Sequence, residues 1–153
     1  MNLICLKEFV SFCFFITYFI LAMGNRIEDL EIYNLADSFA NKIWLIVLEW
    51  DYFSKDTVGK QIVRSADSIS ANIAEGFGRY HYKENKNFCY FSRGSLIETK
   101  GWLNKCKDRN LISEEKYQEL IKELETIHHK LNIYIKYIGK QIIEQPNNDP
   151  MTQ

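Results

Sequence analysis

Glu125 and His128 form a Glu-x-x-His pair, the pattern in this sequence that is closest to metal chemistry. Carboxylate-bridged di-iron bundles need two such pairs and two further glutamates that face the bundle interior. Glu75 and Glu98 are candidates for those glutamates, but the sequence contains no second Glu-x-x-His pair. We therefore expect neither a metal site nor a cofactor, and we expect His128 to lie at a helix edge.

Other catalytic patterns are incomplete. No serine has a base partner at a recognisable spacing, and Gly76 and Gly78 are not followed by the lysine of a phosphate-binding loop. Cys89 and Cys106 fall on one predicted helix about 25 Å apart, too far for a disulfide within that helix. We expect no catalytic residue, no small-molecule substrate, and reduced, partly buried cysteines in the cytoplasm.

Three polar residues share one side of a predicted helix: Asn72, Glu75 and Arg79, at spacings of three and four. Arg64 and Glu98 are expected to approach them from elsewhere in the fold. Such a group either holds a ligand or satisfies backbone groups at a helix end that the nearby glycines terminate. We favour the structural interpretation, because carboxylates and amides commonly fix helix ends and pair with arginine.

Positive charge is concentrated in the middle of the chain. Residues 55–109 contain eleven Lys or Arg and six Asp or Glu, whereas residues 23–54 contain two and six. Residues 79–93 alternate bases with aromatics, as RNA-contacting surfaces do, although a solvated face with aromatics in the core is the simpler interpretation. The candidate nucleic-acid contacts are Lys60, Arg64, Arg79, Lys83, Lys86 and Arg93.

Four amphipathic segments must position these side chains, and no segment has the alternation of a strand. The first two cover residues 30–51 and 57–76, with Asp56 as the N-cap of the second. The expected inward positions of the second are Val58, Ile62, Ala66, Ile69 and Ile73. Short loops between the segments predict an all-α, antiparallel up-down-up-down four-helix bundle within residues 23–143.

The third and fourth segments begin near residues 82 and 113. In the third we expect Gly94 and Gly101 to mark close helix packing. The third segment is expected to bury Phe88, Phe91, Ser95, Thr99, Trp102 and Cys106, flanked by Leu96 and Leu103. The fourth is expected to bury Tyr117, Leu120, Leu124, Ile127, Leu131, Tyr134, Ile138 and Ile142.

A second apolar face appears on the first helix, where Trp44, Leu45 and Leu48 fall off the core stripe. One bundle core cannot cover two faces of a helix, so these residues are candidates for a contact between subunits.

The ends of the chain are different in character. Residues 9–23 are an apolar run that as a helix would span about 22 Å, short for a bilayer of about 30 Å. We favour a translation start at Met23 over a signal or membrane anchor and over an additional helix. Residues 1–22 are therefore treated as an extension, and residues 144–153, which contain both prolines, as a disordered tail.

The sequence RSADSISANIAEGFGR at residues 64–79, followed by GSLIET at 94–99, resembles the 23S rRNA intervening sequence proteins. LEIYNLA at residues 30–36 fits the same family, and the resemblance extends to about residue 141. It implies a homopentamer of four-helix bundles, and it implies a relationship to the accessory proteins of diversity-generating retroelements, which associate with nucleic acid. The chain departs from the family pattern at Val63, Ser70 and His81.

These observations predict a non-catalytic, homo-oligomeric scaffold for a protein partner. The alternative is an RNA-binding accessory protein that uses the basic second and third helices. Fold does not fix function, so both hypotheses depend on surfaces.

Overall fold

The computed structural model describes residues 26–144, and all regular structure in that range is helical. The first element is a short 3₁₀ turn, η1, at Ile27–Asp29. The helices that follow are α2 Glu31–Leu48, α3 Tyr52–Ser54, η2 Lys55–Gly59, α4 Lys60–Phe77, α5 Tyr82–Asp108 and α6 Glu114–Glu144. No helix within residues 26–144 combines the length and the apolar character that crossing a bilayer requires. The predicted extension, residues 1–22, lies outside the described residues, as does the predicted tail except for Glu144, which still belongs to α6.

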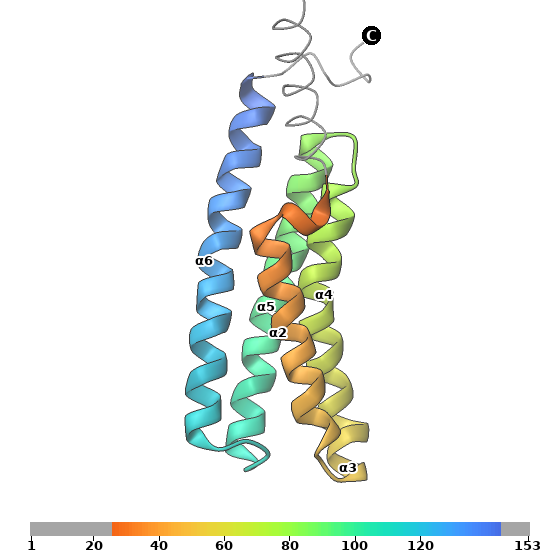
Figure 1. Cartoon of the computed structure of the whole chain (residues 1–153), viewed down its shortest axis with the longest axis vertical. Helices are drawn as coiled ribbons and strands as arrows, with labels where there is room; N and C mark the ends of the chain where they lie inside the picture. The colour runs from red at the N-terminus through yellow and green to blue at the C-terminus, as the bar shows by residue number, and fades with distance from the viewer. Residues whose placement is uncertain (1–25, 145–153) are drawn as a thin grey trace, which may run out of the picture. The chain divides into compact units, whose positions relative to one another are not determined.

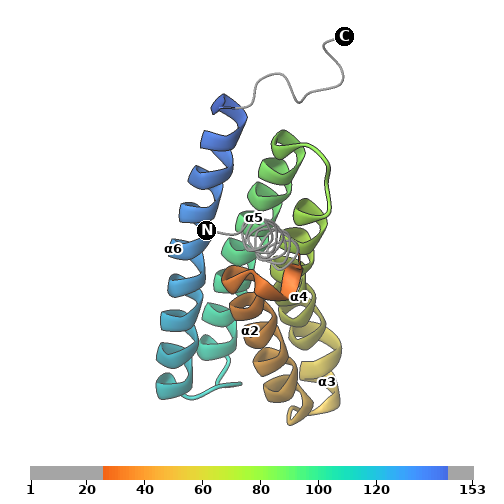
Figure 2. The same ribbon diagram turned by 45° about the horizontal axis from the view of Figure 1, so that its top comes forward.

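Helices α2, α4, α5 and α6 form an antiparallel four-helix bundle, as the sequence predicts (Figure 1). Successive helices lie side by side, and α5 packs against both α4 and α6 (Figure 2). The fourth side of the bundle is tied by Lys42 of α2, whose ammonium lies 3.2 Å from the Glu119 carboxylate of α6.

The core follows the predicted stripes of α4 and α6. All five predicted inward residues of the second helix, from Val58 in η2 to Ile73 in α4, are buried. Leu120, Leu124, Ile127, Leu131 and Ile138 of α6 are also buried, whereas the predicted Tyr117, Tyr134 and Ile142 are half-buried. The predicted stripe of α5 is correct at Thr99 and Cys106, which are buried, but it is wrong in phase in the first half of the helix. There Phe91 is 59% exposed, and Cys89 and Ser92 are buried instead. The residues of α5 that are buried are Asn85, Cys89, Ser92, Leu96, Thr99, Leu103 and Cys106.

Small polar side chains line the contact between α4 and α5. The Ser92 hydroxyl donates to the Ile69 carbonyl at 2.8 Å, and the hydroxyls of Thr99 and Ser65 lie 3.0 Å apart. Each buried hydroxyl therefore has a partner, which removes most of the cost of burying it. The small residues let the two helices approach closely and leave no space for large aromatic rings, which explains the phase error in α5.

The chain reverses direction after α2, and α3, η2 and α4 then form one continuous helix. The Asp51 carboxylate caps α3, accepting hydrogen bonds from the Ser54 backbone N–H at 3.1 Å and from the Ser54 hydroxyl at 2.6 Å. The π-helical segment η2 then runs directly into α4. Asp56 lies inside this continuous helix, so its predicted role as an N-cap is wrong, and the helix begins earlier than the sequence pattern indicates.

The glycines divide into two classes. A Cβ added to Gly76 would lie 2.9 Å from the Phe88 Cβ, and one added to Gly59 would lie 2.7 Å from Val47 Cγ1. Close packing therefore requires glycine at these two positions. Nothing within the described residues lies within 4 Å of a Cβ added to Gly94 or Gly101, so the prediction that these two mark close packing is wrong for the single chain.

Candidate functional site

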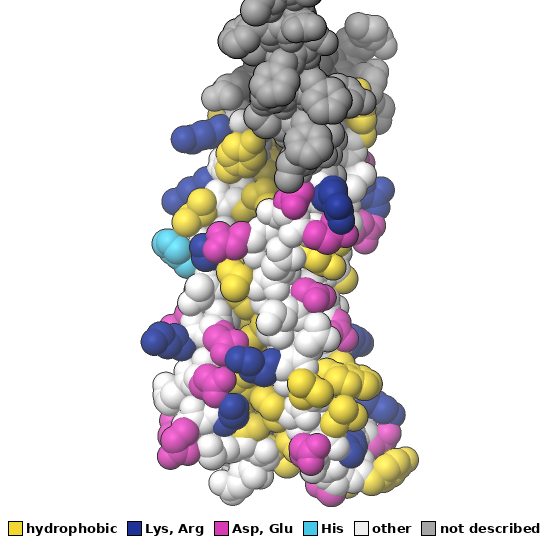
Figure 3. Space-filling view, in the orientation of Figure 1, with side chains coloured by type: hydrophobic (Ala, Val, Ile, Leu, Met, Phe, Trp, Pro, Cys, Tyr) yellow, Lys and Arg dark blue, Asp and Glu magenta, His cyan; other side chains and the backbone are white. Residues whose placement is uncertain are grey.

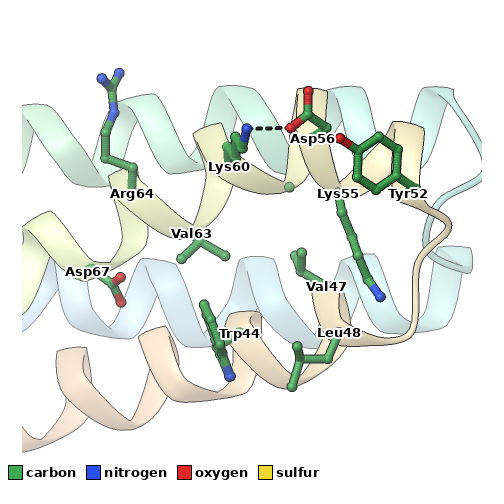
Figure 4. Close-up of a pocket in the computed structure, with 11 residues that line it drawn as sticks. Trp44, Val47, Leu48, Tyr52, Lys55, Asp56, Lys60, Val63, Arg64 and Asp67 are labelled. Atoms are coloured by element: carbon green, nitrogen blue, oxygen red, sulfur yellow. Dashed lines mark hydrogen bonds and ion pairs between the residues drawn. The ribbon is translucent and has the colours of Figure 1, made fainter.

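An open apolar groove of about 570 Å³ lies between α2 and the helix that runs from α3 through η2 into α4 (Figure 4). We call it the α2–α4 groove. Its lining residues are Trp44, Val47, Leu48, Tyr52, Lys55, Asp56, Gly59, Lys60, Val63, Arg64 and Asp67. Trp44 and Leu48 project from α2 on one side, and Val63 faces them from α4 (Figure 4).

Large apolar side chains extend from the groove onto the surface around it. The predicted second face of α2 is exposed, with Trp44 at 51%, Leu45 at 63% and Leu48 at 46%. Tyr52 and Phe53, which sequence reasoning missed, join them at 82% and 73% exposure. Figure 3 shows this apolar area over α2 and α3, at the lower right. The pair of aromatics in the reversal sequence DYFSKD is the signal that would have revealed the extension.

The charged residues at the groove are unevenly satisfied. Lys60 pairs with Asp56, one turn earlier on the same helix, whereas Lys55 at this end has no carboxylate partner within the described residues. At the other end, burial raises the pKa of the Asp67 carboxyl, and the nearby negative charge of Asp37 raises it further. A cation brought to Asp67 by a bound partner would relieve both effects.

The predicted polar cluster of Asn72, Glu75, Arg79, Arg64 and Glu98 separates into different places. Arg79 pairs with Glu75, and the Arg79 guanidinium carbon lies 4.8 Å from the centroid of the Phe88 ring. The Asn72 amide donates to the Ser68 carbonyl within the same helix at 2.7 Å. The Arg64 guanidinium lies 3.7 Å from the Glu98 carboxylate, about four turns before Arg79 on α4. Arg64–Glu98 and Arg79–Phe88 are therefore contacts between α4, or its end, and α5, whereas the contacts of Asn72 and Glu75 are local to α4.

The six predicted nucleic-acid contacts fall into two groups. Those on α4 or at its end are paired with carboxylates: Lys60 with Asp56, Arg64 with Glu98 and Arg79 with Glu75. Lys83, Lys86 and Arg93 of α5 have no carboxylate partner among the described residues. The Arg93 guanidinium instead lies 4.9 Å from the centroid of the Tyr90 ring. The structure therefore leaves three of the six predicted contacts without a carboxylate partner within the described residues.

The groups considered for metal and thiol chemistry have ordinary structural surroundings. Glu125 of the Glu-x-x-His pair forms an ion pair with Lys100 of α5 at 3.2 Å, and His128 is half-buried. Within residues 26–144, no three His, Cys, Asp or Glu side chains gather as metal ligands would. Cys89 and Cys106 are free and fully buried, and burial raises the pKa of their thiols to about 12 and about 11.

The sequence profile of the 23S rRNA-intervening sequence protein family matches residues 28–133, most of the bundle. The chain belongs to this family. A solved crystal structure of a protein of unknown function from the S23 ribosomal protein family of Bacteroides thetaiotaomicron VPI-5482 is similar, with 24% sequence identity and a TM-score of 0.62. That similarity covers 69% of this chain and 98% of the Bacteroides chain, and at this identity it supports the fold alone. No curated protein matches the chain.

Proposed function

We propose that this protein is a non-catalytic homo-oligomeric scaffold, in which the α2–α4 groove and the apolar residues around it contact a second copy. The observation that carries the proposal is the gathering of five large, exposed apolar side chains at one place: Trp44, Leu45, Leu48, Tyr52 and Phe53. Isolated exposed apolar residues are ordinary, but a contiguous patch that extends into a groove is typical of an interaction site.

A second copy is the occupant that fits the described chemistry. Trp44, Leu48 and Val63 offer a hydrocarbon surface without a catalytic or metal-binding arrangement, and Trp and Tyr are enriched at the centres of protein interfaces. The Asp67 carboxyl adds one charge that a partner cation would stabilise. A cyclic assembly would repeat this contact at every subunit boundary, and five copies is the number that the family resemblance implies.

The scaffold role would follow from repetition. An oligomer presents several copies of every remaining surface at fixed distances, so a protein partner that contacts two of them gains affinity without any new contact. The scaffold role predicts that a bound protein partner is present at a fixed ratio to the oligomer, and this ratio can be measured on the purified complex.

Light scattering after size-exclusion chromatography tests the assembly. The wild-type chain at tens of micromolar is expected to have the mass of an oligomer. The double variant Trp44→Glu and Leu48→Glu is expected to have a lower mass with unchanged helical circular dichroism, because it buries two charges in the proposed contact.

The matched control is Phe91→Glu with Ile97→Glu. These residues are also large and exposed, at 59% and 54%, but they lie on α5. The control variant is expected to keep the wild-type mass. A monomeric wild type would end the proposal, and dissociation of the control to the same extent would show that the interface lies elsewhere.

A further inference from the structure

Acidic residues are absent from two neighbouring stretches of the bundle. Helix α5 has none between Glu84 and Glu98, and α6 has none between Glu125 and Glu144. The same stretches contain the basic residues Lys86, Arg93, Lys130, Lys136 and Lys140, with His128 and His129. In Figure 3, basic and apolar side chains alternate along the upper part of α6 at the left edge. Both stretches therefore carry positive charge and contain no acidic residue of their own.

Contacts between α5 and α6 bring these cations together. The Arg93 guanidinium donates to the Asn132 side-chain oxygen at 3.3 Å. The Lys86 ammonium lies against Gly139, where an added Cβ would be 3.3 Å from its Nζ. Lys136 is exposed and follows Asn132 by one helical turn, on the same side of α6. We call the surface formed by Lys86, Tyr90, Arg93, Asn132, Lys136 and Gly139 the α5–α6 strip.

An exposed aromatic ring lies between the two cations of α5. Tyr90 is 40% exposed, with the Arg93 guanidinium 4.9 Å and the Lys86 ammonium 6.0 Å from its ring centroid. Both cations thus keep their charge available, because an aromatic face does not neutralise a cation as a carboxylate does. Elsewhere in the described bundle Lys42, Lys60, Arg64, Arg79, Lys100, Lys107 and Lys116 lie within 4.0 Å of a carboxylate, whereas Lys55, Lys83, Lys105, Arg109 and Lys122 do not.

We propose that the α5–α6 strip binds single-stranded nucleic acid, with the cations of both helices contacting phosphates and Tyr90 stacking on a base. Proteins that bind single strands combine a basic track with aromatic platforms in this way. An unpaired strand fits better than a duplex, because a base must leave its stack to reach the tyrosine ring. The strip contains Lys86 and Arg93, which were among the contacts predicted from sequence. It contains a cation of α6, Lys136, in place of the paired cations on α4 or at its end.

Fluorescence anisotropy with a fluorescein-labelled 20-nucleotide oligouridylate tests the proposal on the full chain. At low salt the wild type is expected to bind, with an affinity that falls steeply as salt is added. The double variant Lys86→Glu and Arg93→Glu is expected to weaken binding at least about tenfold. It should also lower the slope of log affinity against log salt by about 1.4, which corresponds to two lost phosphate contacts on a single strand.

The matched control is Lys107→Glu with Lys116→Glu, which makes the same change in net charge at cations that already have carboxylate partners and lie outside the α2–α4 groove. This control is expected to lose much less affinity. Equal loss in both double variants would mean that net charge alone drives binding, and no binding by the wild type at low salt would refute the proposal.

Two further comparisons separate stacking and fold from charge. Tyr90→Phe is expected to bind as the wild type does, and Tyr90→Leu is expected to bind several-fold more weakly. Because Arg93 also ties α5 to α6, the exposed pair Lys136→Glu and Lys140→Glu serves as a second test that does not touch this contact. Equal displacement of the oligonucleotide by polyglutamate of the same charge would identify a general polyanion surface and overturn the proposal. Light scattering on each variant shows whether its oligomer mass is unchanged, so that weaker binding can be distinguished from a change in assembly.

Discussion

Glycine-to-alanine substitutions at four positions should have opposite effects on stability, according to how closely the bundle packs. Alanine in place of glycine in a helix interior is favourable by about 1 kcal/mol when its methyl group has space. At Gly76 the new Cβ would lie 2.9 Å from Asn85 Oδ1, 2.9 Å from the Phe88 Cβ and 3.0 Å from the Asn85 carbonyl oxygen. The Phe88 Cβ and the Asn85 carbonyl oxygen are fixed to the α5 backbone and cannot move by a side-chain rotation. The new methyl group would therefore push α4 and α5 apart.

Overpacking of this kind costs about 1–3 kcal/mol, which exceeds the gain in helix propensity. We therefore expect Gly76→Ala to lower the free energy of unfolding by up to about 2 kcal/mol, and Gly59→Ala to lower it for the same reason. At Gly94 and Gly101 the methyl group meets open space, so each substitution should raise the free energy of unfolding by about 0.5–1 kcal/mol. The two gains should add, because the sites are about 10 Å apart on the helix.

Urea unfolding followed by circular dichroism measures these differences. All variants must be compared at one protein concentration, because self-association contributes to the apparent stability. If Gly76→Ala and Gly94→Ala were equally stable, the close approach of α4 and α5 would be refuted. A loss of oligomer mass in Gly94→Ala would show instead that the outer face of α5 lies in a subunit contact.

Two other perturbations test the core and the chain ends. Burial raises the pKa of the Cys89 thiol to about 12 and of the Cys106 thiol to about 11, whereas an unfolded thiol titrates near about 8.5. The unfolded state thus loses protons first as pH rises, and the free energy of unfolding should fall above about pH 8.5, by up to about 1.4 kcal/mol per pH unit for each thiol. Cys89→Ala with Cys106→Ala should flatten this dependence in pH-controlled urea unfolding, and an unchanged slope would contradict the assignment. Deleting residues 1–22 is expected to leave a helical, non-aggregating protein, because the buried apolar residues of the described chain lie between Ile32 and Ile138. Lost circular dichroism or precipitation would count against the interpretation that translation starts at Met23.

The sequence predicts the fold well because the apolar spacing of α4 and α6 matches their buried faces. It predicts the first half of α5 poorly, because hydrophobicity favours burying Phe91, whereas the narrow contact with α4 accepts Ser92. Volume complementarity between two helices is not visible in either helix alone. The exposed face at Trp44 and Leu48 could be predicted, since it exceeds what one core can cover, but the groove could not, because it depends on the path of the chain after α2.

The sequence places Glu75 and Glu98 among the expected neighbours of Arg79 and Arg64, and both ion pairs form, but it does not show which other cations are paired. Arg64 and Glu98 are 34 residues apart, and only the packing of α4 on α5 brings their side chains within 3.7 Å. Lys86 and Arg93 look no different from Arg64 in the sequence, yet they lie next to Tyr90 and the acid-free part of α6. Counting charges along the chain therefore locates a basic region without showing which cations are available.

The π-helical segment η2 makes this bundle tolerant of a one-residue deletion at one place. Buried positions at Ser54, Val58, Ile62 and Ala66 follow one another at intervals of four, and an α-helix would rotate each step about 40° away from the last. The wider turn of η2 absorbs part of that rotation and keeps Ser54 on the same face as Ile62. Loss of a single residue between Lys55 and Gly59 would restore an ordinary α-helical turn, because a π-helical turn holds one residue more than an α-helical turn. Tyr52 and Phe53 would then keep approximately their direction, whereas a deletion in the regular part of α4 would rotate them by about 100° around the helix axis. Variation in chain length is therefore expected to alter association least when it falls within η2.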